Sequence, residues 1–212
     1  MIEKMNEEYY SYIKKWFKKE AGYYHILVDI PSSRLRDKFV NIVNAKKGSR
    51  ILDVATGTGG QAFAFARKGY DVVGVDLSED MVKVAKSLNR YKNLKFRVAD
   101  ATSLPFENNY FDVCCICLAL HDMPLAIRKK ALEEMVRVIK PKGTIAIFDY
   151  VLPKNKILRY LFYYLVKSHE TKYYPEFIKS NLKVLLRKHG IKVEKEIPIL
   201  GFGKILKCLN KK

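Results

Sequence analysis

The chain of 212 residues has four cysteines, a single tryptophan and no uninterrupted apolar run long enough to cross a membrane. Its N-terminus, Met-Ile-Glu-Lys-Met-Asn-Glu-Glu, lacks the apolar core of a signal peptide. Internal repeats and low-complexity linkers are also missing, whereas 49% of the residues are hydrophobic. These features predict a globular, cytoplasmic protein whose length fits one α/β domain and hardly two.

The few cysteines do not form a metal-binding pattern. Cys114, Cys115 and Cys117 fall within one apolar run that is typical of a strand, and neighbouring residues of a strand point to opposite faces. No matching pair of zinc ligands accompanies them, and Cys208 is isolated. We therefore predict no metal site and four structural cysteines, which pack as small hydrophobic residues in a reducing compartment.

Acidic residues are few, because 22 Asp and Glu stand against 40 Lys and Arg, giving a net charge of +18. Such an excess favours an anionic partner, whether RNA, an acidic metabolite or a membrane surface. The lysine pairs are spread along the whole chain, however, and no RNA-binding appendage of a known type is present. Nucleic acid is a partner that the sequence allows but does not favour.

The most informative segment that the chain does contain is a glycine loop within residues 50–60, between an apolar run and a helical pattern. Gly57, Gly59 and Gly60 remove side chains where a ligand must lie against the backbone, and a helix N-terminus follows. Asp53 stands at the mouth of this loop. A carboxylate there suits a ligand that carries an amine or a positive charge better than an anionic pyrophosphate.

Two further acids follow the next two apolar runs. Asp76 ends residues 70–76 at the spacing from which an acid accepts hydrogen bonds from both ribose hydroxyls. Asp100 follows residues 94–98, where its carboxylate is placed to accept from an adenine amino group. Three consecutive strands are thus expected to deliver an acid to the same edge of one sheet.

Four motifs carry a resemblance to a known family. They are Leu-Asp-Val-Ala-Thr-Gly-Thr-Gly-Gly at residues 52–60, the segments at 73–81 and 99–113, and Glu-Glu-Met-Val-Arg-Val-Ile-Lys-Pro-Lys-Gly at 133–143. With them the chain resembles the class I S-adenosylmethionine-dependent methyltransferases, nearest to the group that contains the ubiquinone and menaquinone biosynthesis C-methyltransferases. The resemblance implies S-adenosylmethionine as the cofactor.

The cofactor is predicted to lie against the strand ends, the fourth strand exit and the N-terminal segment. The predicted contacts are Asp53, Ala55, Thr56, Gly57, Gly59, Asp76, Leu77, Met81, Asp100, Ala101, Leu118 and Tyr24. The loop also satisfies the dinucleotide pattern G-x-G-x-x-A. Because Asp53 and Asp100 suit S-adenosylmethionine better than NAD, a dehydrogenase is the weaker alternative.

Alternating apolar runs and helical patterns predict a doubly wound, Rossmann-like α/β fold. Strands are expected at 50–55, 71–76, 94–98, 111–118, 143–149, 191–199 and 204–209. Helices are expected at 2–20, from Ser32 or Ser33 to about Asn44, and at 59–68, 79–89, 125–139, 155–168 and 175–189, with the serine and Ser78 as N-caps. The resemblance implies a seven-stranded, mostly parallel sheet in the order 3-2-1-4-5-7-6, with the last strand antiparallel.

The chain is predicted to form a single methyltransferase domain over residues 1–212. Within it we expect an N-terminal helical lid at 1–45 and a cofactor-binding core at 46–150. Residues 151–212 are expected to supply the acceptor-side helices and the C-terminal strand pair.

The best candidate for a catalytic base is His121, which follows the fourth strand and has Asp122 beside it. The same residue also fits a structural role, in which it bonds a loop carbonyl or lines the cofactor pocket, and Asp122 also fits a turn cap. In the quinone methyltransferases the matching segment has a different sequence, so the resemblance assigns no role here.

A weaker catalytic candidate is His25, in the N-terminal segment. Tyr24 is placed to contact the methionine end of the cofactor, and His25 is placed to reach the acceptor. Packing of the first helix on the sheet accounts for these residues equally well.

The aromatic-rich segment at 157–165 favours a small apolar or aromatic acceptor, or a lipid reached at a membrane surface where lysines hold anionic headgroups. A helix packed on its own core or on a dimer partner is an equal alternative, and the chain is expected to be a monomer or a homodimer. The predicted function is S-adenosylmethionine-dependent methyl transfer to a small molecule. An RNA methyltransferase and a non-catalytic S-adenosylmethionine-binding sensor or partner subunit are the alternatives.

Overall fold

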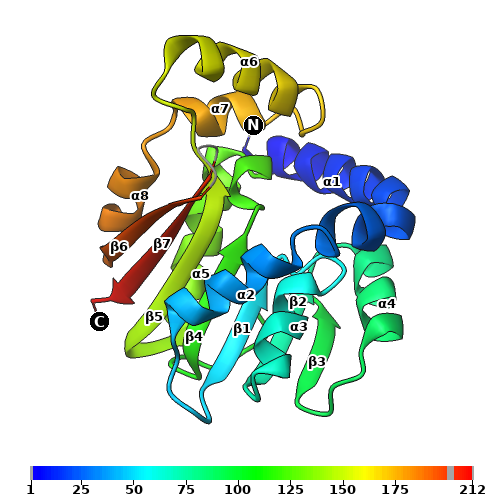
Figure 1. The fold of residues 1–212 in the computed structure, drawn as a ribbon, viewed down its shortest axis with the longest axis vertical. Helices are drawn as coiled ribbons and strands as arrows, with labels where there is room; N and C mark the ends of the chain where they lie inside the picture. Colours follow the sequence, from blue (N-terminus) through cyan, green and yellow to red (C-terminus); the bar gives the residue numbers. More distant parts are fainter. Residues whose placement is uncertain (1, 200–202, 212) are drawn as a thin grey trace.

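The computed structural model describes residues 2–199 and 203–211, and it places a seven-stranded sheet between two layers of helices (Figure 1). The strand order is β3-β2-β1-β4-β5-β7-β6, as predicted. The strands are β1 (Arg50–Val54), β2 (Asp71–Asp76), β3 (Leu94–Val98), β4 (Phe111–Cys117), β5 (Ile139–Tyr150), β6 (Ile191–Ile199) and β7 (Gly203–Asn210). Strands β1 to β5 pair in parallel, and β7 runs antiparallel between β5 and β6.

The helices follow the predicted alternation with the strands. They are α1 (Ile2–Tyr24), α2 (Ser33–Val43), α3 (Gly60–Arg67), α4 (Glu79–Leu88), α5 (Leu125–Val138), α6 (Lys156–Lys167), α7 (Tyr174–Lys179) and α8 (Leu182–Lys188). Two short turns complete the set, a π-helical turn η1 (His25–Asp29) that continues α1 and a 3-10 turn η2 (Leu120–Asp122) after β4. Figure 1 shows α1 crossing one end of the sheet and α6 standing beyond the same end.

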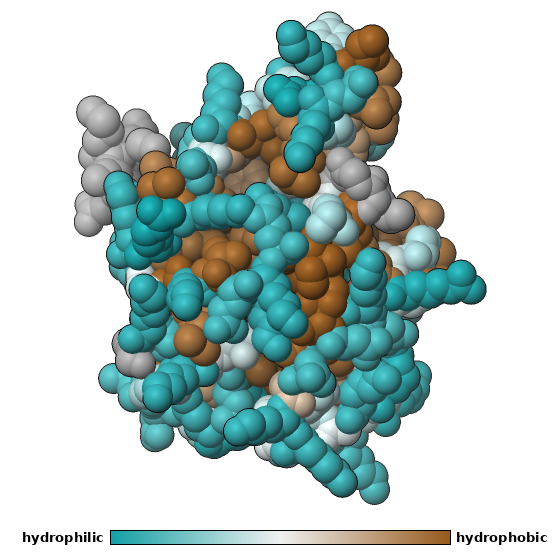
Figure 2. Space-filling model, turned by 60° about the vertical axis from the view of Figure 1, so that its left-hand side comes forward, coloured by the Kyte–Doolittle hydropathy of each residue, from teal (hydrophilic) through white to brown (hydrophobic). Residues whose placement is uncertain are grey.

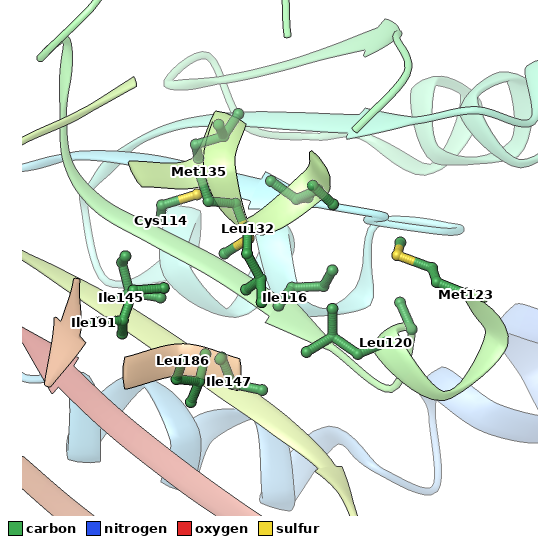
Figure 3. Close-up of a cluster of buried hydrophobic side chains, with 14 of the residues drawn as sticks. Cys114, Ile116, Leu120, Met123, Leu132, Met135, Ile145, Ile147, Leu186 and Ile191 are labelled. Atoms are coloured by element: carbon green, nitrogen blue, oxygen red, sulfur yellow. The ribbon is translucent and has the colours of Figure 1, made fainter. Parts of the chain in front are cut away.

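Alternation along the central strands divides the core between the two faces of the sheet. Ile51 of β1 faces the layer of α2, α3 and α4, whereas its neighbour Leu52 faces the layer of α5 and α8. The core on the side of α5 and α8 contains Leu132 and Leu186, which interdigitate with side chains of β4 and β5 (Figure 3). Because both faces of the parallel strands are covered, these strands are apolar almost throughout.

Three predicted elements differ clearly from the structure. The helix expected at 2–20 continues to Tyr24 and is followed directly by η1. The helix expected at 175–189 is broken into α7 and α8, because Ser180 is extended and the Asn181 side chain caps α8 by accepting from the amide of Val184 at 3.2 Å. Strand β5 begins at Ile139 rather than at 143, since Ile139 already pairs with Phe111.

The two predicted serine caps behave differently. Ser78 caps α4 by accepting from the amide of Met81 at 3.3 Å. Ser32 occupies the N-cap position of α2, but its hydroxyl donates to the carbonyl of Val28 at 2.6 Å instead of accepting from the helix. The turn that precedes α2 is helical, so a carbonyl lies within reach of this hydroxyl.

Gly74→Ala is expected to lower the free energy of unfolding by about 1–3 kcal/mol, the usual cost of overpacking. A Cβ at this position of β2 would lie 2.7 Å from the Phe96 ring and 2.8 Å from Oγ1 of Thr56. Urea unfolding measures the change.

The matched control is Gly22→Ala in α1, where an added Cβ meets nothing within 4 Å. Since alanine favours a helix over glycine, this variant should gain about 0.5–1 kcal/mol. Equal unfolding midpoints for Gly74→Ala and the wild type would contradict the packing described at β2.

Candidate functional site

A pocket opens at the carboxyl-terminal edge of the parallel strands, where β1 and β4 adjoin and the strand order reverses, the usual place for a ligand in such a sheet. It encloses about 1170 Å³ of space, part of it open to solvent. The pocket is lined by eleven of the twelve predicted cofactor contacts: Tyr24, Asp53, Ala55, Thr56, Gly57, Asp76, Leu77, Met81, Asp100, Ala101 and Leu118. The remaining one, Gly59, forms the N-cap of α3 and does not line it.

The glycine loop follows β1 and is tied to the end of β2. Gly57 has a φ of +57°, and its amide donates to Oδ2 of Asp76 at 2.8 Å. A Cβ on Gly57 would lie 3.9 Å from the ring of Tyr24, so the N-terminal segment lies directly over the loop. Gly59 has a φ of +91°, and a Cβ there would approach the Phe96 ring to 2.7 Å. Both glycines therefore have a conformational reason to be glycine.

Two residues that are not glycine also have left-handed backbone at the pocket. Ala55 follows β1 with a φ of +53°, and Leu118 follows β4 with a φ of +50°. Such conformations cost on the order of 1–3 kcal/mol each and occur mostly at functional sites. The strain lies at the two adjacent strand ends that line the pocket.

Asp53 is buried beneath the glycine loop. Its Oδ2 accepts from the Thr56 hydroxyl at 2.6 Å, and its Oδ1 accepts from the Cys115 thiol at 3.3 Å. Burial raises the pKa of Asp53 to about 6, although these hydrogen bonds act in the opposite direction. A cation in the pocket would stabilise the ionised carboxylate.

Asp76 holds backbone amides of the loops that follow β1 and β2, and Asp100 holds an amide of the loop that follows β3. Asp76 accepts from Gly57 through Oδ2 and from the amide of Ser78 through Oδ1 at 2.9 Å. Burial raises the pKa of Asp76, and its backbone hydrogen bonds oppose this shift. Asp100 accepts from the amide of Thr102 at 2.8 Å. Because an ionised carboxylate has about four acceptor positions, each retains capacity for a ligand.

Sequence analysis missed an anchor between the N-terminal segment and the glycine loop. Asp29, at the end of η1, is buried and accepts from the Thr58 hydroxyl and from the Arg36 guanidinium. Asp29 and Arg36 both line the pocket, and Arg36 is close enough to Asp53 to lower its pKa. No clear local signal in the sequence marks this anchor, because a turn separates η1 from α2 and Thr58 lies 29 residues beyond Asp29 in the chain.

Gln61 is a second residue that sequence analysis missed. It lines the pocket at the start of α3 and is 3% exposed. Among the described residues its Nε2 has no hydrogen-bond partner. Since buried amide donors are normally paired, this nitrogen is a candidate donor to a ligand.

His121 does not line the pocket but lies buried beside it, in η2. Its Nδ1 is 2.7 Å from Oδ1 of Asp149, and its Nε2 is 3.1 Å from Oε2 of Glu170 and 3.5 Å from Oδ2 of Asp122. Burial lowers the pKa of His121, but the carboxylates around it outweigh burial and raise the pKa well above its usual range. Both ring nitrogens of His121 thus face carboxylates, and its role as a base stays a prediction.

The neighbouring Asp122 does line the pocket. Burial raises its pKa to about 7, against the attraction of His121. His25, the weaker candidate, lies outside the pocket lining, with Nδ1 3.3 Å from Oδ2 of Asp29. Neither histidine lines the pocket, whereas Asp122 and Tyr24, which adjoin them in the sequence, do.

The cysteines lie in or near the core. Cys114, Cys115 and Cys208 are buried, and Cys117 is half-buried at the end of β4, where it lines the pocket.

Among the described helices none is long and apolar enough to span a bilayer.

Comparison with known proteins gives consistent matches. A family model described as a methyltransferase domain matches residues 52–147. A demethylmenaquinone methyltransferase of Paenarthrobacter aurescens is 37% identical over 150 residues, which are 69% of this chain and 58% of that protein. The ubiquinone/menaquinone biosynthesis C-methyltransferase UbiE of Rickettsia bellii is 34% identical over 176 residues, 76% of this chain and 69% of that protein.

Solved structures with this fold include a protein of Pyrococcus horikoshii, with a TM-score of 0.69, 24% identity and coverage of 90% of this chain and 99% of that one. An S-adenosylmethionine-dependent methyltransferase of Aquifex aeolicus has a TM-score of 0.66, 22% identity and coverage of 82% and 89%. The chain spans only 49% to 60% of the length of several curated relatives that it matches, among them a Renibacterium salmoninarum demethylmenaquinone methyltransferase.

As the pH rises from about 4 to about 7, the free energy of unfolding of the wild type should fall relative to that of the Asp53→Asn variant. The Asp53 carboxyl has a pKa of about 6 in the folded chain and its ordinary value of 3.8 when unfolded. Between these values the folded state binds more protons, so raising the pH favours unfolding. The difference between the two pKa values corresponds to about 3 kcal/mol in the free energy of unfolding.

Urea unfolding of both proteins across this pH range measures the effect, and Asp76, which is present in both, cancels from the difference. Parallel stability curves for the two proteins would show that Asp53 is not a buried acid with a raised pKa.

Proposed function

Because the chain belongs to the class I S-adenosylmethionine-dependent methyltransferases, near the ubiquinone and menaquinone C-methyltransferase group, we propose that it transfers a methyl group from S-adenosylmethionine to a small apolar or aromatic acceptor. The observation that carries this proposal is the convergence of Asp53, Asp76 and Asp100 with the glycine loop on one pocket. The bound cofactor supplies the electrophilic methyl group on its sulfonium.

The donor and acceptor groups of the pocket fit the parts of that cofactor. Asp76 and Asp100 would accept from the ribose hydroxyls and the adenine amino group, and Asp53 would accept from the amine of the methionine end. Arg36 and the unpartnered Nε2 of Gln61 would donate to the methionine carboxylate.

The acceptor side of the pocket is apolar. From α1 come Tyr9, Tyr10, Ile13 and Phe17, and from beyond η2 comes Met123. Such a lining would orient an aromatic ring and exclude water, with one polar group, Asp122, at its border. The names of the relatives point to a quinone precursor, which is an aromatic acceptor of this kind.

The surface of α6 supports an acceptor that is reached at a lipid membrane. Ile157, Leu158, Leu161 and Leu165 are each more than half exposed on this helix. Residues 151–169 carry no acid, and the helix holds Lys156, Arg159 and Lys167. In Figure 2 apolar side chains reach the surface at the top of the molecule, the end at which Figure 1 places α6. A basic helix with an exposed apolar face binds anionic lipid surfaces.

Arg36→Met is expected to weaken the affinity for S-adenosylhomocysteine tenfold or more, the usual loss when a charge-assisted hydrogen bond is removed. Adenosine, which lacks the methionine end, should bind both proteins alike. Calorimetric titration with S-adenosylmethionine, S-adenosylhomocysteine, adenosine and NAD measures these affinities, and NAD should not bind.

The control for this titration is Arg34→Met, an exposed arginine on the same helix, which should leave every affinity unchanged. An equal loss for adenosine would mean that Arg36 only holds the fold through Asp29. Binding of NAD alone would overturn the choice of cofactor.

Methyl transfer itself is tested with labelled S-adenosylmethionine and a lipid-soluble naphthohydroquinone that has one unsubstituted ring carbon. We expect label in the quinol, and more of it when the quinol is presented in anionic phosphatidylglycerol vesicles than in neutral phosphatidylcholine vesicles. Leu161→Glu should reduce vesicle binding and transfer together while leaving cofactor affinity unchanged, because Leu161 is 59% exposed on α6.

The matched control is Val184→Glu on α8, which introduces the same charge at a position that is 41% exposed. It should change neither vesicle binding nor methyl transfer. Label recovered in RNA instead would support the RNA methyltransferase alternative. Tight cofactor binding with no labelled product from any extract would support a sensor or partner subunit.

A further inference from the structure

Four side chains from three separate segments of the chain converge beside the pocket. His121 and Asp122 come from η2, Asp149 from the end of β5 and Glu170 from the segment after α6. One potential ligand atom from each of His121, Asp122 and Glu170 lies within 4.8 Å of the others. Nε2 of His121 is 3.5 Å from Oδ2 of Asp122 and 3.1 Å from Oε2 of Glu170. Ligands on one tetrahedral metal ion with bonds of about 2.0–2.2 Å stand about 3.3–3.6 Å apart, so these separations suit shared coordination.

Two of these three side chains are each held by a further hydrogen bond. Nδ1 of His121 bonds Asp149 at 2.7 Å, which leaves Nε2 to face Asp122 and Glu170. The Tyr150 hydroxyl donates to Oε1 of Glu170 at 2.7 Å. A carboxylate behind the histidine and a donor behind a carboxylate are the usual support of metal ligands in proteins.

The charge of this cluster is not balanced by the side chains that form it. Among residues 2–199 and 203–211, the ion pairs of Asp122, Asp149 and Glu170 all go to His121. Three carboxylates around one imidazole leave an excess of at least two negative charges when all are ionised. Asp122 is only 6% exposed, and within the same described residues its Oδ1 has no hydrogen-bond partner. A buried carboxylate oxygen without a partner calls for a cation.

We propose that His121, Asp122 and Glu170 form a binding site for one divalent transition-metal ion of the zinc class. An imidazole ligand favours zinc-class ions over magnesium and calcium, which prefer oxygen ligands alone. Three protein ligands leave a coordination position open, and Asp122 lies on the pocket wall, so the ion would lie at the border of the pocket. If the proposed function holds, the ion would polarise an acceptor oxygen there; the binding itself does not depend on that function.

The test uses the full chain, stripped with a chelator and without cofactor or acceptor. Calorimetry with Zn²⁺ and ligand-field absorption with Co²⁺ should both show one ion per chain, and the Co²⁺ spectrum should be that of a four-coordinate nitrogen and oxygen site. Asp122→Asn and Glu170→Gln, which keep size and hydrogen bonding, should each weaken binding at least tenfold.

The matched control is Glu133→Gln, which neutralises a glutamate whose Oε1 lies 3.4 Å from His189 on the surface. It should bind Zn²⁺ and Co²⁺ like the wild type. The wild-type Co²⁺ spectrum decides the question even if a variant does not fold, because an unchanged aqueous spectrum overturns the site. Equal affinities for Glu170→Gln and the wild type would overturn it too.

The outcome separates this inference from the proposed function. A chain that binds Co²⁺ with the expected spectrum but transfers no methyl group keeps the metal site and loses the function. A chain that transfers the methyl group yet takes up neither ion keeps the function and loses the metal site.

Discussion

Parallel pairing of β1 to β5 is the constraint on which the rest of the structure depends, because it brings all five carboxyl-terminal strand ends to one edge. The chain places acids at or just beyond these ends: Asp53, Asp76, Asp100, Asp122 and Asp149. Burial of such a set is costly, and the raised pKa values of Asp53, Asp76 and Asp122 record that cost. A chain with a net charge of +18 thus has an acidic site, which suits a cationic ligand.

The N-terminal segment completes this edge through specific contacts. Tyr9 and Ile13 of α1 are buried in the core, so the middle of this helix is packed on the molecule. The Asp29 carboxylate then joins Arg36 to Thr58, which fixes the turn over the glycine loop. The segment expected to be a lid is therefore held by both apolar packing and a buried ion pair, and local opening there would have to break both.

Local signals in the sequence were sufficient to predict the strands and the glycine loop, because an apolar run or a glycine determines the backbone conformation of the residues next to it. They were also sufficient in principle for the break before α8, since Ser180-Asn181 is a cap signal inside the predicted helix. The surroundings of His121 could not be predicted in this way. Asp149 and Glu170 lie 28 and 49 residues further along the chain, and only the folded sheet and the return of the chain after α6 bring them together.

The two halves of the pocket differ in how freely they can change. On one side, Gly57, Ala55 and Leu118 have left-handed backbone, and the acids bond loop amides, so a substitution there disturbs the backbone that shapes the pocket. On the other side, α1 and Met123 after η2 contribute side chains whose backbone is ordinary. Substitutions of residues such as Phe17 and Met123 are therefore expected to leave the backbone of the glycine loop unchanged. If this chain and its relatives differ in their acceptors, we expect the residues responsible to lie on α1 and around His121, and not in the glycine loop.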